Sequence, residues 1–380
     1  MEKRLSGGRV RVTRRRVLAA SGTAMVALAG CVGGGESGPR AVDAEPFGSP
    51  LESSAISWDD LGDLEGELSI YSGRTRDQID PLFHAIEEEY DGFDLSIRHG
   101  DNTDLLNLLG QEGRASPADV FYSQDAGALA EVKADELAQE LPTDITDAIE
   151  GTYRDDDAMW VGASGRVRAI QFNTERWEDR AEALPDDIME YAYDERFENQ
   201  ISMRPNSGTS RAFVAAMLEL EGESATRDWI SAMVEDQNAT FYGGGSEQAR
   251  AVRDGDQTIA LGNQYYAGRI LAEEPDAPLD VAFTEDDAGC LFNVSGVAIL
   301  DSASDGGLAA EFCRHLLATE AQEFFVETNG EYPVVDGVDY VGDLPALEEI
   351  NPPEFNLSTL NLELQEVRDL MDELDMVVGR

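Results

Sequence analysis

Two adjacent tyrosines, Tyr265 and Tyr266, are the residues of this chain that indicate chemistry most directly. A phenol has an ordinary pKa of about 10, so it is a poor ligand at neutral pH until a strong Lewis acid displaces its proton. Ferric iron is such an acid, and the hard phenolate oxygen suits a hard trivalent cation. The alternative is that both rings are packing residues with a hydroxyl at the surface.

A second candidate site is the turn formed by Ser207, Gly208 and Thr209, within the stretch 204–210. Because this turn directly precedes a predicted helix, its backbone N–H groups and hydroxyls suit an oxyanion. The alternative is that Ser207 is an ordinary N-cap.

Three stretches rich in polar residues follow predicted strands, namely 71–75, 116–125 and 262–266. In doubly wound sheets, ligands bind beyond the carboxyl ends of the strands. These stretches are therefore candidates for the walls of a binding site.

The elements that must position these residues alternate in type along the chain. Short apolar runs predict strands at 68–71, 93–97, 119–122, 167–172, 259–261, 281–283 and 291–300. Amphipathic stretches predict helices at 77–90, 104–111, 211–219, 225–234, 246–253 and 309–328, and in the last 30 residues. The alternation indicates an α/β fold with largely parallel sheets. The length exceeds what one core usually holds, which predicts two lobes.

The chain is strongly acidic. Its 77 acidic and 28 basic residues give a formal net charge of -49. The acids run through the whole chain, and Lys133 is the only lysine after residue 30. At about 1 M salt the Debye length falls to roughly 3 Å, which screens the self-repulsion. The composition is similar to that of proteins from extreme halophiles, and it argues against nucleic acid as a partner.

Cysteine and histidine chemistry is sparse. Cys290 and Cys313 could form a disulfide outside the cell or remain two buried thiols, and the sequence leaves both open. The three histidines, at 84, 99 and 315, have no zinc-site spacing, so a histidine-based zinc site is not expected.

The N-terminus predicts export. Residues 13–18 form a twin-arginine pattern, and the apolar stretch 17–29 is too short for a comfortable membrane span. It ends in Leu-Ala-Gly-Cys, which resembles a lipobox, so we expect cleavage before Cys31 and lipid on that cysteine. The alternative is an ordinary signal with a chance cysteine.

The order and spacing of these stretches resemble the ferric-binding proteins, the substrate-binding lipoproteins of iron(III) ABC importers. The resemblance covers about residues 68–335 and is carried by 116–123, 164–168, the tyrosine pair and 330–333. It implies a bilobal, type II periplasmic-binding-protein fold, with two α/β lobes, a hinge and a cleft. It also implies ferric iron in the cleft, held by two tyrosinates and a synergistic anion such as carbonate, phosphate or citrate.

Carried over by position, the resemblance makes Tyr265 and Tyr266 the metal ligands and places the 207–209 turn on the anion. Arg166 falls on a hinge-side arginine that faces the cleft, and Arg74 could hold the anion with it. The alternative for Arg74 is a solvated loop charge with an acidic neighbour. The expected cleft supports are Ser72, Gly73, Thr75 and Asn263.

The chain departs from the family pattern at three ligand positions, the third being Thr209, where another branch of the family supplies a third tyrosine at the anion turn. Many members have a histidine where this chain has Thr75 and a glutamate where it has Gln124. Asp125 is next to Gln124, but adjacent strand residues face opposite ways unless the backbone bends. Gln124 and Asp125 are therefore further candidate ligands, and anion and water could instead fill the remaining positions.

The leading hypothesis is a binding protein without catalysis, which captures ferric iron or a small ferric chelate and delivers it to an ABC permease. An alternative is a binding protein for a phosphorylated or carboxylated organic anion. A secreted hydrolase would need a nucleophile beside a base, and no G-x-S-x-G motif is present. His99 precedes a predicted loop and could be exposed, whereas His84 and His315 are predicted within helices.

The expected organisation is a signal at 1–30, a flexible tether at 31–66 and two lobes. Lobe 1 comprises 67–165 and 296–345, and lobe 2 comprises 166–295 and 346–380. We expect a monomer that is lipid-anchored at the outer face of the cell membrane.

Overall fold

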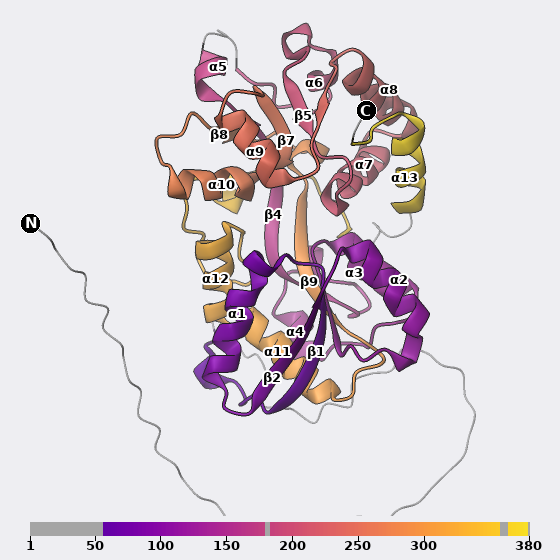
Figure 1. Cartoon of the computed structure of the whole chain (residues 1–380), viewed down its shortest axis with the longest axis vertical. Coiled ribbons are helices and arrows are strands. Elements are labelled where there is room, and N and C mark those ends of the chain that lie inside the picture. Colours follow the sequence, from indigo (N-terminus) through magenta and orange to yellow (C-terminus); the bar gives the residue numbers. More distant parts are fainter. Residues whose placement is uncertain (1–55, 179–182, 358–363, 379–380) are drawn as a thin grey trace, which may run out of the picture. The chain divides into compact units, whose positions relative to one another are not determined.

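The computed structural model describes residues 56–178, 183–357 and 364–378 (Figure 1). The predicted export signal, Cys31 and the expected tether up to residue 55 lie outside the described residues. No helix in the described part of the chain is both long and apolar enough to cross a membrane.

The strands form one hydrogen-bonded array in the order β2-β1-β3-β9-β4-β7-β5-β6, with β8 paired to β4. Their bounds are β1 Gly66–Ser72, β2 Phe93–His99, β3 Val120–Ser123, β4 Val161–Phe172, β5 Ile201–Met203, β6 Thr240–Phe241, β7 Ile259–Asn263, β8 Asp280–Ala282 and β9 Phe292–Ile299.

Strand β4 divides this array into two parts. Its residues 161–167 pair with β9, and its residues 168–172 pair with β7. We call β2, β1, β3, β9 and the first part of β4 the β1 sheet. The second part of β4 with β7, β5, β6 and β8 is the β7 sheet. Figure 1 shows β4 and β9 running side by side between the two sheets.

The expectation of largely parallel sheets was wrong, because the pairings are mixed. Strand β1 pairs in parallel with β2 and β3, and β5 pairs in parallel with β6 and β7. Strand β9 is antiparallel to β3 and β4, and β4 is antiparallel to β7 and β8. Buried strands of either direction carry the same apolar pattern, so the sequence could not distinguish them.

Helices pack around both sheets. Their bounds are α1 Arg76–Glu89, α2 Asn102–Glu112, α3 Ala126–Ala134, α4 Thr143–Asp147, α5 Thr174–Glu178, α6 Glu190–Tyr193, α7 Gly208–Leu220, α8 Glu223–Glu235, α9 Gly245–Arg253, α10 Gln264–Glu273, α11 Gly306–Leu317, α12 Thr319–Asn329 and α13 Leu364–Glu373. Helices α1, α2, α3, α11 and α12 contact strands of the β1 sheet, α9 and α10 contact the β7 sheet, and α13 packs on α7.

The single helix expected at 309–328 is two helices. Ala318 separates α11 from α12 with an extended backbone, φ -75° and ψ 160°. The Gln322 amide donates to the carbonyl of Leu316 at 2.8 Å, which satisfies one carbonyl at the end of α11. The apolar periodicity continues across this break, so the sequence predicted one helix where there are two. The helix expected after residue 352 is confirmed only as α13 within the described residues.

The segment expected to be the end of a flexible tether is packed onto the fold from Ser57. The Trp58 indole donates to the carbonyl of His315 at 2.9 Å, and the Gly62 N–H donates to Glu311 at 2.8 Å. Leu61 and Leu64 are buried. Burying these two side chains offsets the conformational entropy that the segment loses on packing. The segment from Ser57 onward is therefore not expected to act as a flexible linker.

His315 is a buried histidine of the α11 core. Its Nδ1 donates to the carbonyl of Glu311 at 2.8 Å, since a carbonyl can only accept. Nε2 of the neutral ring then accepts from the Tyr90 hydroxyl, also at 2.8 Å. Burial lowers the pKa of His315 from 6.5 to about 4.

Because of His315, we expect the free energy of unfolding to depend on pH in the acid range. Because the pKa of His315 is lower in the folded state, the unfolded chain binds more protons between pH 6.5 and 4. Stability should therefore fall as the pH falls through that window, by about 3 kcal/mol from this group. Chemical denaturation of wild type and His315→Gln at high salt measures it, with the exposed His84→Gln as the control. Parallel pH profiles for His315→Gln and wild type would contradict the assignment.

Candidate functional site

A cleft of about 430 Å³ collects residues from all four of the sequence stretches singled out above. Its walls come from the segment after β1, the start of α1, the segments after β2 and β3, the start of α7 and the start of α10. The lining residues are Gly73, Arg74, Thr75, Gln78, His99, Gly100, Asp101, Asn102, Gln124, Asp125, Arg204, Asn206, Ser207, Gly208, Thr209, Arg211, Asn263, Tyr265 and Tyr266.

The tyrosine pair lies in the first turn of α10, where β7 ends at Asn263. The Tyr265 ring is buried, Tyr266 is half-buried, and their ring centroids are 4.2 Å apart. Burial raises the pKa of Tyr265, and the neighbouring Tyr266 raises it further, whereas the charge of Arg166 lowers it. A Lewis acid must therefore displace the proton before Tyr265 can act as an anionic donor.

Two residues contact the Tyr266 side chain, Arg204 at its hydroxyl and Gly245 at its ring. Nη1 of Arg204 donates to the Tyr266 Oη at 3.3 Å, and Nε of Arg204 donates to the carbonyl of Gly243 at 3.1 Å. Gly245 lies against the ring, since a Cβ there would be 2.3 Å from two ring carbons. The glycine at the first position of α9 thus leaves space for the phenol, and Arg204 supplies a donor to its oxygen.

The turn at the start of α7 has the geometry of an N-cap and also that of an oxyanion site, the two alternatives left by the sequence. Ser207 is the N-cap, and its Oγ accepts from the Ser210 N–H at 3.2 Å. The first N–H groups of a helix have no partner within the helix. Those of Gly208 and Thr209 therefore lie at the positive end of the α7 dipole. A capped helix start that lines a cleft is a suitable place for an oxyanion.

Asp125 lies opposite this turn and caps α3. Its Oδ1 accepts from the Ala128 N–H at 3.1 Å, and its Oδ2 accepts from the Asn102 amide at 2.8 Å. Its carboxylate also abuts α7, because a Cβ on Gly208 would be 2.2 Å from Oδ2. The hydrogen bonds hold Asp125 as a cap and a cross-cleft contact, and its role as a metal ligand stays a prediction.

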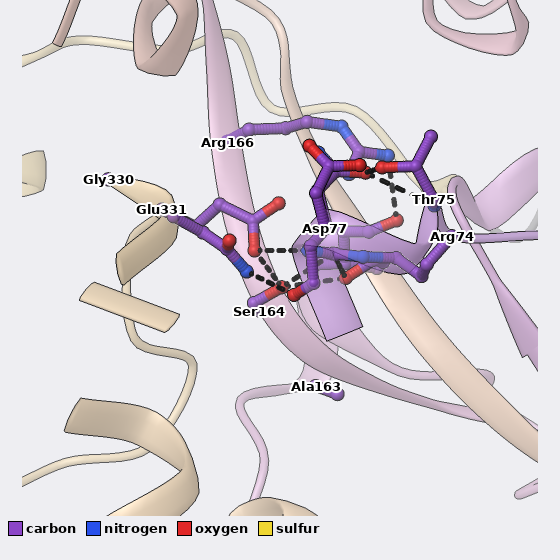
Figure 2. Close-up of polar contacts among 12 residues, drawn as sticks. Arg74, Thr75, Asp77, Ala163, Ser164, Arg166, Gly330 and Glu331 are labelled. Carbon is purple, nitrogen blue, oxygen red and sulfur yellow. Dashed lines mark hydrogen bonds and ion pairs between the residues drawn. The ribbon is translucent and has the colours of Figure 1, made fainter. Parts of the chain in front are cut away.

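Arg74 has a structural partner of its own. Nη2 lies 2.9 Å from Oε2 of Glu331, and Nη1 donates to the Ser295 hydroxyl at 2.6 Å (Figure 2). Both charged side chains are fully buried. Burial lowers the pKa of Arg74, but the charge of Glu331 outweighs it and holds that pKa above its ordinary value. Arg74 is therefore no solvated loop charge, and its paired guanidinium opposes the prediction that it holds the anion.

Arg166 is the buried guanidinium with spare donors. It is 1% exposed, and its Nη2 donates to the carbonyl of Val294 at 3.4 Å. Its Nε and Nη1 have no hydrogen-bond partner among the described residues. Figure 2 shows the side chain extending toward the segment of Arg74 and Thr75. Its charge acts on Tyr265, although Arg166 itself does not line the cleft.

The remaining predicted supports have local roles. The Thr75 hydroxyl donates to Oε1 of Gln78 at 2.9 Å at the start of α1. Ser72 is buried, and its Oγ accepts from the Arg74 N–H at 3.2 Å. Gly73 is packed against Asn102, and Gln124 lies in the cleft wall.

Several cleft residues were given no binding role by the sequence analysis, namely Gln78, His99, Asn102, Arg204 and Arg211, although Arg204 lies within the selected stretch 204–210. Arg204 and Arg211 flank the 207–209 turn, so their position beside a candidate anion site was a usable signal. His99 carried no such signal. Its Nδ1 donates to the carbonyl of Arg74 at 3.0 Å, and its Nε2 lies 2.9 Å from Asp80.

Other metal chemistry finds no support in the described ranges. No group of three or more His, Cys, Asp or Glu side chains gathers there in a way that could hold a metal. Cys290 and Cys313 are both free and buried, which decides the question left open above in favour of two thiols. A metal site made only of such side chains is therefore not supported in the described part of the chain.

Comparison with known proteins identifies similar chains. The family model for the bacterial extracellular solute-binding proteins matches residues 115–355. Iron uptake protein A1 of Synechocystis is 27% identical over 342 residues, which are 86% of this chain and 93% of that protein.

Solved structures show the same fold. Iron-bound HitA from Pseudomonas aeruginosa superposes with a TM-score of 0.75 at 24% identity, over 81% of this chain and 99% of its own. A Trichodesmium protein in complex with iron and citrate gives 0.68 at 25% identity, over the same shares. These matches confirm the type II binding-protein fold and the resemblance to ferric-binding proteins.

The Gly208 contact predicts that any side chain there keeps the cleft walls apart. Gly208→Ala places a methyl group 2.2 Å from the Asp125 carboxylate, and such overpacking typically costs about 1–3 kcal/mol. Small-angle scattering should show a more open protein than wild type. Gly110→Ala is the matched control, because no atom lies within 4 Å of a Cβ at that helical position. Identical scattering from Gly208→Ala and wild type would contradict this contact.

The buried ion pair predicts a large stability loss on removing one partner. Glu331→Ala leaves the Arg74 guanidinium buried without its counter-charge, which should cost about 3–5 kcal/mol. Denaturant unfolding at high salt measures the loss. The exposed Glu223→Ala should change stability by no more than about 0.5 kcal/mol. Equal stability of Glu331→Ala and wild type would show that the pair is not structural.

Proposed function

Because the chain belongs to the family of bacterial extracellular solute-binding proteins, we propose that it captures ferric iron, free or as a small chelate, for an ABC importer. The observation that carries the proposal is the tyrosine pair at the start of α10, inside a cleft shared by both sheets. The similarity to named iron uptake proteins supports the choice of metal.

Tyr265 and Tyr266 would bind the ferric ion as phenolates. Iron displaces both phenolic protons, and the phenolates reduce the charge of the ion from +3 to +1. Arg204 donates to the Tyr266 oxygen, and the buried charge of Arg166 favours the anionic form of Tyr265. The two arginines thereby lower the cost of placing negative oxygens in a partly buried site.

A synergistic anion completes the coordination in this proposal. Carbonate, phosphate or citrate would bind at the start of α7, at the N–H groups of Gly208 and Thr209 and the Ser207 hydroxyl. Thr75 and Gln124 stand where many ferric-binding proteins have ligands. Anion, water or a shifted Asp125 would fill the positions that these residues leave.

Delivery follows from a hinge between two lobes. The proposed boundaries, 165/166 in β4 and 295/296 in β9, lie side by side because Ser164 pairs with Ser295 and Gly165 with Val294. Lobe 1 is then 67–165 with 296–345, and lobe 2 is 166–295 with 346–380. Bending at these two strands would open the cleft, and the closed lobes would dock on the permease.

Export and anchoring remain part of the proposal. A twin-arginine signal ahead of Cys31 and lipid on that cysteine would hold a monomeric protein at the outer face of the membrane. The acid excess would suit a strongly saline exterior.

A second candidate is a binding protein for a phosphorylated or carboxylated organic anion. The arginines of the cleft wall, Arg204 and Arg211, favour it, and so does the absence of family ligands at Thr75 and Gln124. The intact tyrosine pair opposes it. A hydrolase has less support, because both ring nitrogens of His99 already contact other groups and leave no base for a nucleophile.

An absorption titration tests the iron proposal. Ferric citrate added to the protein without its lipid, at high salt, should produce an intense tyrosinate-to-iron charge-transfer band that saturates at one iron per chain. Tyr265→Phe and Tyr266→Phe should each weaken or abolish the band, whereas the exposed Tyr193→Phe should retain it.

The opposite result has a definite meaning. If no band forms, and phosphate or a sugar phosphate still raises the melting temperature, the protein is an organic-anion binder. The raised temperature would follow from preferential binding to the folded state.

A further inference from the structure

Several arginines at or beside the cleft have no carboxylate partner among the described residues. The chain carries 77 acidic residues against 28 basic ones, so an arginine should find a carboxylate easily. Eight arginines of the described residues do form ion pairs, namely Arg74, Arg76, Arg114, Arg196, Arg227, Arg253, Arg269 and Arg314. Five arginines at or beside the cleft have no carboxylate of the described part within ion-pairing distance: Arg166, Arg168, Arg204, Arg211 and Arg368.

Arg211 is the arginine that lines the cleft directly and has a buried donor without a partner among the described residues. It lies in the first turn of α7, and its N–H donates to the carbonyl of Ser207 at 3.1 Å. The side chain lines both the cleft and a neighbouring groove of about 220 Å³ against α13. Its Nε is buried and has no hydrogen-bond partner among the described residues. A buried donor without a partner is costly, which favours an acceptor from outside.

Arg368 makes the same place more positive. It belongs to α13 and lines the groove with Arg211, together with the apolar side chains of Met371 and Met376 and the carboxylate residue Asp372. Burial lowers the pKa of Arg211, and the charge of Arg368 acts in the same direction, whereas Asp125 opposes them. Two like charges on a partly apolar surface repel each other, and an anion between them would remove that repulsion.

The charges of Asp125, Asp101 and Glu131 all act on Arg211, but none of the three forms an ion pair with it. Asp125 already accepts from Asn102 and from the Ala128 N–H, and its distance to Arg211 exceeds that of an ion pair. Arg211 therefore lines the cleft without an ion pair among the described residues, and an acid group of a ligand would supply one.

We propose that Arg211, supported by Arg368, binds a free acid group of the chelator, so that the site selects iron carried as an anionic polycarboxylate chelate. This inference rests on the proposed function and adds its specificity residue. The cleft volume of about 430 Å³ lies within the range of small-molecule sites, about 300–1,000 Å³, and exceeds what one ion needs.

Charge arithmetic favours such a ligand over the bare ion. A ferric ion held by two phenolates keeps a charge of +1, and the unpaired arginines add to it. A cationic ligand would approach this wall against repulsion, whereas an anionic chelate would be attracted and could form bidentate contacts with a guanidinium. The chelate then brings the synergistic anion with it, and Arg211 holds the arm that does not bind the metal.

The test compares two iron sources in four proteins. Ferric citrate has free acid groups, and ferric acetohydroxamate has none. The charge-transfer band is titrated with each source in wild type, Arg211→Gln, Arg211→Lys and the control Arg227→Gln, a surface arginine on α8. Circular dichroism and melting temperature establish that each variant is folded.

The expected result is a loss confined to one source. Arg211→Gln should bind ferric citrate about 10- to 100-fold more weakly than wild type, while iron from acetohydroxamate gives unchanged binding. The affinity of Arg211→Lys for ferric citrate should lie between those of wild type and Arg211→Gln, because lysine keeps the charge and loses the bidentate geometry. Arg227→Gln should match wild type with both sources.

Other outcomes overturn the inference in distinguishable ways. Equal affinity of wild type and Arg211→Gln for ferric citrate, or equal losses for both iron sources, would overturn the specificity role and leave the iron proposal standing. No band in wild type from either source would overturn the proposed function, and the inference with it.

Discussion

A buried ion pair between Arg74 and Glu331 is the contact on which the arrangement of the cleft depends. Arg74 follows β1, Glu331 follows α12, and the pair closes over Ser164 of β4 and Ser295 of β9. It therefore joins β9, and the strand β4 that both sheets share, to a wall of the cleft. A charge pair excluded from water tolerates little displacement, since each partner depends on the other for its solvation. The pair also explains why Arg74, although it lines the cleft, is engaged in holding the fold.

The charge of the cleft wall is opposite in sign to the net charge of the chain. The protein as a whole is strongly acidic, yet the wall around the start of α7 carries arginines that lack ion-pair partners among the described residues. Salt screens exposed charges far more than buried ones. At high salt the acidic surface would lose most of its field, whereas the partly buried arginines and the α7 helix start would keep their effect. The site can therefore attract an anionic ligand in a protein whose net charge would otherwise repel it.

The sequence predicted the parts of the site that depend on local pattern. The strand ends, the start of α7 and the tyrosine pair were found because turn residues and apolar runs mark them, and the structure brings them to one cleft. Contacts between distant residues were not predictable. Glu331 is 257 residues from Arg74, and no local pattern links them. The strand β4 was predicted too short, since its buried Ser164 and Arg166 interrupt the apolar run.

Anomalous diffraction at the iron absorption edge, from crystals soaked with ferric citrate, is the most direct test of the central claim. One anomalous peak is expected in the cleft, within bonding distance of the hydroxyl oxygens of Tyr265 and Tyr266, with citrate density at the start of α7. Absence of a peak, or a peak on the acidic surface away from both phenols, would contradict it.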